Sequence, residues 1–316
     1  MTTASTPKTL LQEEPSRMET AWETGRFRPQ RGPKQLLFGH MYEDWERIEA
    51  RYFAKRSRVF SIASAGSTAI ALATDHHVIA VDINPVQLDY ARRRAQGAPP
   101  ERGAAERLLA RGRHCYALMG WNHECLEQFL ALDDPREQLR IWNARLNTPA
   151  FRAGIDALFS PLVLRMAYAP RFLAVLPKHF GLVVRERLER TWATHPNRGN
   201  PCVRALLTGE VPPARRTPRA LDLEFAVADA ANYLEACRPA SFDAFTLSNI
   251  LDGASAAYRR RLFGAVRRAA SPEAVVILRS FAQPDGHEYR NICAEDRSPL
   301  WGVVDVRPVG SLEDAA

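Results

Sequence analysis

Residues 58–82 contain the pattern that most restricts the fold of this chain. Residues 58–63 form a short apolar run, which is typical of a buried strand. A turn of small residues follows it: Ser64, Ala65, Gly66 and Ser67. An Ala- and Leu-rich helix is expected over 68–73, and a second apolar strand over 78–82 ends on Asp82. Strand, small-residue turn, helix and strand with a terminal acid form half of a nucleotide-binding βαβ unit.

Further strands are predicted in the last third of the chain. They lie at 221–227, 242–247, 274–278 and 301–307. Helices are expected between them, over 231–236 and over the basic amphipathic segment 258–270. The strand at 301–307 is expected to close the sheet as an antiparallel edge. Alternating strands and helices predict an α/β fold with a mostly parallel, Rossmann-like sheet.

Residues 97–220, between the two groups of strands, show helical rather than strand periodicity. Apolar residues recur three or four positions apart, as in Phe151 and Ile155. The segment is too long for a loop. We therefore expect a helical insertion that covers the open end of the sheet and shapes an acceptor pocket.

The domain organisation follows from these segments. Residues 34–96 and 221–316 are expected to form the two halves of one nucleotide-binding domain, with the insertion between them. Residues 1–33 are polar, rich in Thr, Ser, Glu, Arg and Pro, and lack the apolar core of a signal peptide. They are expected to be a disordered tail.

Composition excludes some functional classes. The 316-residue chain carries a net charge of +7, mostly from arginines scattered along predicted helices, which indicates solvated faces rather than a nucleic-acid site. Its five cysteines include no C-x-x-C pair, so neither a disulfide framework nor a metal site is expected. No stretch of about 18 apolar residues predicts a membrane span. We expect a cytoplasmic protein, peripheral to a membrane at most. Apolar runs and arginines alternate over 158–184, which favours buried insertion helices, with contact at a membrane interface as the alternative.

The small-residue turn and Asp82 suggest a nucleoside site. Small side chains allow the backbone to approach a ligand closely, and an acid at the end of the next strand is placed to accept hydrogen bonds from a ribose diol. The alternatives are an ordinary strand-to-helix turn and a helix-capping aspartate. The same edge of the sheet adds further candidate cofactor-binding residues: Ile83, Gln87, Asp229, Ala230, Ser248 and Asn249.

The identity of the nucleoside follows from the glycine count. A single glycine in the loop argues against the tight packing of a dinucleotide pyrophosphate. S-adenosylmethionine has no phosphate and fits better than NAD. Asp229-Ala230 is placed for the adenine amino group, although helix capping explains both this pair and Ser248-Asn249 equally well.

Several blocks of sequence resemble a known family. They are F-G-H-M-Y-E-D-W (38–45), S-I-A-S-A-G-S-T-A (61–69), A-V-D-I-N-P-V-Q (80–87), L-S-N-I-L-D (247–252), V-V-I-L-R-S-F (275–281) and D-R-S (296–298). In this order they resemble the diacylglycerol 3-amino-3-carboxypropyl transferases, which start betaine-lipid synthesis. The likeness covers most of the chain after residue 35. The insertion matches only loosely, and Ser67 stands where a cysteine is expected.

The resemblance implies a class I methyltransferase-like fold that uses S-adenosylmethionine as donor. It also implies transfer of the aminocarboxypropyl group to a hydroxyl of a diacylglycerol-like lipid or small molecule, with release of methylthioadenosine. The γ-carbon of the donor must then face the acceptor, so the amino-acid end has to be held in a turned pose. Arg279 is the candidate cation for its carboxylate, with a salt bridge to an acid as the alternative.

A hydroxyl acceptor requires a general base. Tyr42, Glu43 and Asp44, just before the first strand, are candidates because they are placed to fold over the cofactor; an exposed helix start is the alternative. His123 in the insertion is a second candidate. Two other functions remain open: small-molecule methyl transfer, and non-catalytic nucleoside binding.

Overall fold

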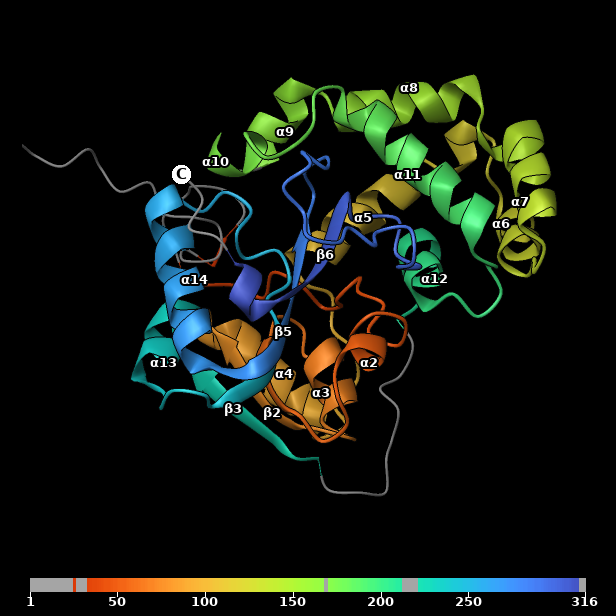
Figure 1. The fold of residues 1–316 in the computed structure, drawn as a ribbon. Helices are drawn as coiled ribbons and strands as arrows, with labels where there is room; N and C mark the ends of the chain where they lie inside the picture. The colour runs from red at the N-terminus through yellow and green to blue at the C-terminus, as the bar shows by residue number, and fades with distance from the viewer. Residues whose placement is uncertain (1–24, 27–32, 168–169, 212–220, 313–316) are drawn as a thin grey trace, which may run out of the picture.

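The computed structural model describes residues 25–26, 33–167, 170–211 and 221–312. Figure 1 shows an α/β unit with a group of helices beyond one end of its sheet. The predicted disordered tail, residues 1–33, lies almost entirely outside the described residues.

The sheet has six strands in the order β3-β2-β1-β4-β5-β6. Their bounds are β1 Arg58–Ile62, β2 His77–Asp82, β3 Leu223–Val227, β4 Phe242–Thr246, β5 Ala270–Ser280 and β6 Val303–Pro308. The first five are mutually parallel, and β6 pairs antiparallel with β5. The sheet confirms the predicted Rossmann-like α/β class and the antiparallel edge.

Helices cover both faces of the sheet (Figure 1). Residues from α2 (Glu49–Tyr52), α3 (Ser67–Leu72) and α4 (Pro85–Ala95) belong to one core cluster, around Val59, Val78 and Ile277. The other face packs on α13 (Ala230–Ala236), α14 (Ala256–Ala269) and η3 (Val309–Ser311) around Phe60 and Phe245. Strands buried on both faces read as continuous apolar runs, which is why the sequence showed them clearly.

Proline and capping side chains determine where many helices begin. Asn84 caps α4 by accepting a hydrogen bond from the Val86 backbone N–H, and Pro85 occupies the first turn. Ser255 caps α14 in the same way, through the Tyr258 N–H. The same rule applies within the insertion, where α7, α8 and α12 each begin at a proline that follows a capping Asp, Thr or Asn.

The described part of residues 97–211 is helical. Its helices are α5 Ala104–Arg113, η1 Ala117–Met119, α6 His123–Leu130, α7 Pro135–Ile141, η2 Trp142–Leu146, α8 Pro149–Leu158, α9 Pro161–Ala167, α10 Pro170–Leu173, α11 Phe180–Thr194 and α12 Pro201–Thr208. Seven of them, η1, α6, α7, η2, α8, α11 and α12, share a core built around Trp121, Trp142 and Trp192. This separate core explains how the insertion holds its shape beyond the sheet.

Arg187 of α11 fastens the insertion to the sheet. Its buried guanidinium donates hydrogen bonds to the carbonyl oxygens of Phe281, Ala282 and Leu300, at 2.9, 3.0 and 2.8 Å. Phe281, just after β5, also packs against Phe180 and its neighbours on the insertion. The insertion helices are therefore held over the end of the sheet.

Candidate functional site

The strand order reverses between β1 and β4, and open α/β sheets bind ligands at the carboxyl ends of such strands. Both strands end in backbone that an L-residue rarely adopts. Ser64 after β1 has φ 43°, and Ser248 after β4 has φ 50°. Positive φ at non-glycine residues often accompanies a functional site. The two strained serines therefore mark the carboxyl ends of β1 and β4 as a candidate ligand site.

The loop after β1 is held by backbone and small side chains. The Ser64 N–H donates to Oδ2 of Asp82 at 3.0 Å, and Ala65 packs against Met41 and Tyr90. Gly66 has φ 81°, and a Cβ there would lie 3.0 Å from the Cβ of Ala91. Ser67 begins α3, and its Oγ accepts a hydrogen bond from the Met41 N–H at 3.5 Å. The loop thus packs closely against α4 on one side and residues 38–41 on the other.

Asp82 lies at the end of β2, beside this loop. Its carboxylate accepts hydrogen bonds from the backbone N–H groups of Ser64 and Asn84, at 3.0 and 2.8 Å. Burial raises its pKa to about 6, against the opposing effect of these two donors and of Lys34. Lys34 donates to the carbonyl oxygen of Ile83 at 3.0 Å, next to the acid. Asp82 therefore shapes the loop, and its remaining lone pairs are the ones a ribose diol would use.

The side chain of Gln87 bonds protein backbone in this structure, not an open site where a ligand could bind. Its side chain is buried, with Oε1 accepting from the N–H groups of Leu37 and Phe38 and Nε2 donating to the Phe38 carbonyl. All of these bonds tie residues 37–38 to α4. The amide is occupied in holding the segment that precedes β1.

Asp229 caps α13, which is one of the two alternatives that the sequence left open. Its Oδ1 accepts from the Asn232 N–H at 3.0 Å, and its Oδ2 accepts from the Tyr258 hydroxyl at 2.6 Å. Ala230 is buried at the start of the helix. The pair stays at the predicted edge of the sheet, one strand beyond Asp82.

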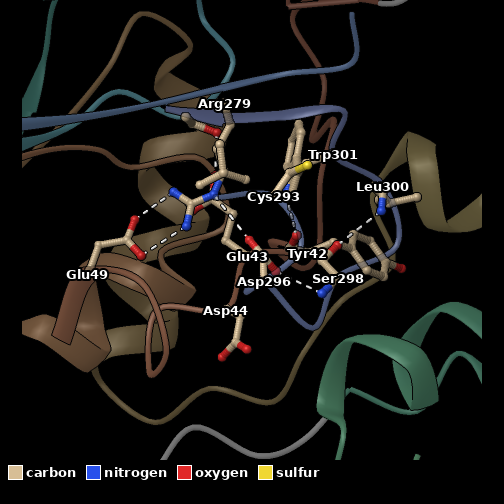
Figure 2. Close-up of polar contacts among 12 residues, drawn as sticks. Tyr42, Glu43, Asp44, Glu49, Arg279, Cys293, Asp296, Ser298, Leu300 and Trp301 are labelled. Atoms are coloured by element: carbon tan, nitrogen blue, oxygen red, sulfur yellow. Dashed lines mark hydrogen bonds and ion pairs between the residues drawn. The ribbon is translucent and has the colours of Figure 1, made fainter. Parts of the chain in front are cut away.

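Arg279 forms the centre of a buried charged cluster (Figure 2). Its fully buried guanidinium is paired with Glu49, through contacts of 2.6 and 2.9 Å. The carboxylates of Asp296 and Glu43 lie 3.6 and 3.9 Å from its nitrogens. The structure therefore shows the salt-bridge alternative for Arg279, because its donors face buried acids rather than the cavity.

Acids outnumber cations in this cluster. Asp44, with a side chain 1% exposed, pairs with Arg297 at 2.5 Å, so two arginines face Glu43, Asp44, Glu49 and Asp296. Burial raises the pKa of Asp296 to about 7, although Arg279 opposes the shift. Burial also raises the pKa of Glu43. Burial thus favours the neutral forms of these two acids, and the other two carboxylates are each paired with an arginine.

Glu43 bridges the two strained loops. Its Oε2 accepts from the Thr68 hydroxyl of α3 at 2.8 Å, and its Oε1 accepts from the Ser248 hydroxyl after β4 at 2.5 Å. The exposed-helix alternative for residues 42–44 is wrong, since Tyr42, Glu43 and Asp44 are all buried. Glu43 therefore lies at the carboxyl edge of the sheet, between α3 and the end of β4.

A cavity of about 320 Å³ adjoins this edge. Ser64, Ser248, Asn249 and Glu43 form one part of its lining, and residues of the insertion form most of the rest. The insertion contributes apolar side chains, including Trp121, Phe151, Ile155, Phe180 and Leu188. Asp82 and Asp229 are outside the lining. The cavity thus extends from the loops after β1 and β4 into an apolar chamber.

The remaining base candidates differ in their access to this cavity. Tyr42 lines it and forms a hydrogen bond with Arg113, and burial raises the pKa of its hydroxyl. His123 is exposed at the start of α6 and is not part of the lining. His40, which the sequence analysis did not select, does line it. The signal for His40 was present, because it belongs to the same F-G-H-M-Y-E-D-W block as Glu43.

Among the described residues, no group of three or more His, Cys, Asp and Glu side chains is arranged to hold a metal ion. No helix in these residues has both the length and the apolar character needed to cross a membrane.

Comparison with known proteins gives distant likeness only. No protein-family model and no curated protein matches the chain. Among solved structures, a SAM-dependent methyltransferase from Methanosarcina mazei aligns with 14% identity and a TM-score of 0.33, covering 75% of this chain and 57% of that one. The rRNA methyltransferase AviRa from Streptomyces viridochromogenes aligns with 13% identity and a TM-score of 0.29, covering 83% and 80%. The chain therefore spans little more than half the length of the first of these proteins.

Proposed function

We propose that this protein is an S-adenosylmethionine-dependent transferase that modifies a hydroxyl of an apolar, lipid-like acceptor. The observation that carries the proposal is the cavity. It joins the strand-order switch point, where this fold class binds ligands, to a chamber lined by apolar side chains of the insertion.

The cofactor edge fits the adenosyl part of the donor. Asp82 supplies carboxylate lone pairs at the end of β2, and Ser64 of the loop after β1 lines the cavity. When bound, the donor supplies an electrophilic carbon next to sulfur, and the chain's own residues orient it and exclude water.

The insertion suits an acceptor with hydrocarbon chains. Leu108 and Leu158 line the cavity and are also 38% and 37% exposed, so they form part of its mouth. Leu162 on α9, four residues beyond Leu158, is 71% exposed. Exposed leucines beside an apolar cavity are typical of a surface that receives a lipid, which supports peripheral contact with a membrane.

The transferred group is proposed to be 3-amino-3-carboxypropyl, on the basis of the sequence resemblance. Methyl transfer is the second candidate, and the position of Arg279 favours it. Aminocarboxypropyl transfer needs a partner for the donor carboxylate in its turned pose, and Glu49 already holds the guanidinium expected to serve. Arg113 is a guanidinium on the cavity lining, although it donates to the carbonyls of Ala205 and Leu206.

By-product analysis tests the proposal. The protein is incubated with S-adenosylmethionine and detergent-dispersed diacylglycerol, or with soluble alcohols, and the products are identified by mass spectrometry. Acceptor-dependent methylthioadenosine is expected. Acceptor-dependent S-adenosylhomocysteine would show methyl transfer instead. Tight donor binding with neither by-product would replace the proposal with non-catalytic nucleoside binding.

A cavity variant tests the acceptor site separately. Ile155→Asp places a charge in the apolar lining, so it should lower acceptor-dependent turnover at least about tenfold while leaving donor affinity unchanged. Leu182→Asp is the matched control, because Leu182 is 46% exposed on α11 and lies outside the lining. Equal turnover of the two variants would contradict an acceptor in this chamber.

A further inference from the structure

The polar side chains on the cavity lining differ in whether they already have partners. Glu43 accepts from Thr68 and Ser248, and Asn249 donates to Asp252. Arg113 donates to the carbonyls at the end of α12 and also bonds the hydroxyls of Tyr42 and Tyr116.

His40 is the exception among these side chains. Its residue is 9% exposed and lines the cavity, yet neither ring nitrogen has a hydrogen-bond partner among the residues that the structure describes. Buried polar atoms are nearly always paired in native proteins. An unpaired imidazole on the wall of a cavity therefore points to a missing partner, and the cavity is where that partner would lie.

The backbone of His40 is held firmly beside the cofactor loop. Its N–H donates to Oε1 of Glu106 at 3.2 Å, and the Gly39 N–H donates to Oε2 of the same carboxylate at 2.8 Å. The next residue, Met41, bonds Ser67 and packs on Ala65. The imidazole itself packs edge-on against Tyr42, with ring centroids 5.0 Å apart. These contacts fix the ring without using its nitrogens.

The surroundings keep the imidazole neutral at physiological pH. Burial lowers the pKa of His40 to about 4, and the positive charge of Arg94 on α4 contributes. The other ionisable groups packed around it are Glu106 of α5, which bonds its backbone, and Tyr42 on its own segment. A neutral imidazole has one nitrogen that donates and one that accepts. His40 thus has an unused proton acceptor buried in the wall of the cavity.

We propose that His40 is the residue that accepts the proton of the acceptor hydroxyl during transfer, a role that rests on the proposed transferase function. Glu43 and Asp44 are less suited to it. Both oxygens of Glu43 already accept hydrogen bonds, and Asp44 is paired with Arg297. In this view Glu43 is a positioning residue, because it joins the loops after β1 and β4.

The reaction balances without any further reactant. The acceptor O–H bond breaks and its proton passes to an imidazole nitrogen of His40. The oxygen forms a bond to the donor carbon, and the carbon–sulfur bond breaks with its electron pair going to sulfur. The sulfonium becomes a neutral thioether as the imidazole becomes a cation, so the net charge of the site is constant.

The test compares variants at His40 with an exposed histidine. His40→Gln preserves hydrogen bonding but cannot take up the proton. Its acceptor-dependent release of methylthioadenosine or S-adenosylhomocysteine should fall about 100-fold, which is the lower range for losing a general base. Donor affinity by calorimetry should stay within about threefold of wild type. His114→Gln, at an exposed histidine outside the lining, is the matched control and should keep full activity.

Two further readouts separate proton transfer from a structural role. The rate of wild type should fall on the acid side as His40 becomes protonated, and the residual rate of His40→Gln should lack this decline. Added imidazole should restore part of the rate of His40→Ala, because the truncated side chain leaves space beside the cavity.

The outcomes distinguish failure of the proposed role of His40 from failure of the proposed transferase function. If wild type forms neither by-product, the proposed function fails and the role of His40 fails with it. If wild type is active and His40→Gln stays within threefold of it, the role of His40 alone is wrong. If His40→Gln and His40→Ala both lose donor binding, and imidazole does not restore the rate of His40→Ala, His40 has a structural role instead.

Discussion

At the residue scale, polar groups at the carboxyl edge of the sheet serve the fold and the proposed ligand at once. Asp82 is the clearest example, since its carboxylate accepts two backbone N–H groups and still faces the loop after β1. The sequence alone predicts that Asp82→Ala abolishes donor binding with an intact fold. The structure changes that expectation, because the variant would also release the Ser64 and Asn84 N–H groups.

We predict that Asp82→Ala weakens S-adenosylmethionine binding by about 10- to 100-fold and destabilises the protein by about 1–3 kcal/mol. Calorimetry and urea unfolding measure the two effects. Asp243→Ala is the matched control, since Asp243 also accepts a backbone N–H, from Arg58, but at the opposite end of the sheet. Unchanged donor affinity in Asp82→Ala would remove the ribose assignment.

Burial of His40 leads to a second prediction, which concerns the pH dependence of the free energy of unfolding. The pKa of His40 in the folded protein is about 4, below the usual 6.5, so the fold favours the neutral form. As pH falls from 6.5 towards 4, the unfolded chain binds a proton that the folded protein does not, and stability is lost. The glutamine of His40→Gln does not bind a proton in this pH range, so the variant lacks this loss of stability.

Comparison of wild type with His40→Gln therefore isolates this contribution. Between pH 7 and pH 4.5, the wild type should lose about 2–3 kcal/mol of unfolding free energy relative to the variant. Urea unfolding at the two pH values measures the difference. A constant difference would show that the His40 ring is not held neutral by burial.

At the element scale, the turn between β1 and α3 depends on one glycine. Gly66 combines a left-handed backbone with close packing, since a Cβ would meet Ala91 at 3.0 Å and Ile70 at 3.1 Å. Gly97, after α4, has a similar φ of 92° but nothing within 4 Å of its Cβ position. Alanine substitution at Gly97 therefore tests the effect of backbone strain alone, and substitution at Gly66 tests strain together with steric crowding.

Both alanine variants should be destabilised by about 1–2 kcal/mol through the left-handed backbone. Gly66→Ala should lose more, because Ala91 lies within the α4 packing and has little freedom to move. It should also weaken donor binding, whereas Gly97→Ala should not. Thermal unfolding and calorimetry of the two variants test this, and equal losses would show that α4 adjusts to the methyl group.

At the scale of the whole molecule, the acceptor chamber exists only where the insertion meets the sheet. Arg187 makes three hydrogen bonds across this junction from a buried position. Arg187→Met should therefore destabilise the protein by about 3–5 kcal/mol, since three carbonyls lose a charged donor. Acceptor turnover should fall more than donor affinity, because the donor edge belongs to the sheet.

Arg140→Ala supplies the control for this variant. Arg140 is an exposed arginine on α7, paired with Glu137 in the same helix. Surface pairs of this kind contribute about 0–1 kcal/mol, so stability and turnover should be nearly unchanged. Similar melting temperatures for Arg187→Met and wild type would mean that apolar packing around Phe281 alone holds the insertion.

Much of the fold was predictable because it depends on local patterns. Strands buried on both faces show as apolar runs, and helices such as α4 and α7 begin at a cap followed by proline. The antiparallel edge at β6 was predicted from one short apolar run at the end of the chain. These signals lie within a few residues of each other, so they can be read along the sequence.

The candidate site was less predictable because the hydrogen-bond and ion-pair partners of its residues come from distant parts of the chain. The sequence by itself determined the sheet, its carboxyl edge and the residues that gather there, since strand direction alone brings the ends of β1, β2 and β4 together. Only the tertiary structure decided that Glu49 pairs with Arg279 and that Gln87 holds the chain before β1. It also decided that the ring nitrogens of His40 have no hydrogen-bond partner among the described residues. The physical reason is that burial and pairing depend on what packs around a side chain, and a one-dimensional pattern does not contain those neighbours.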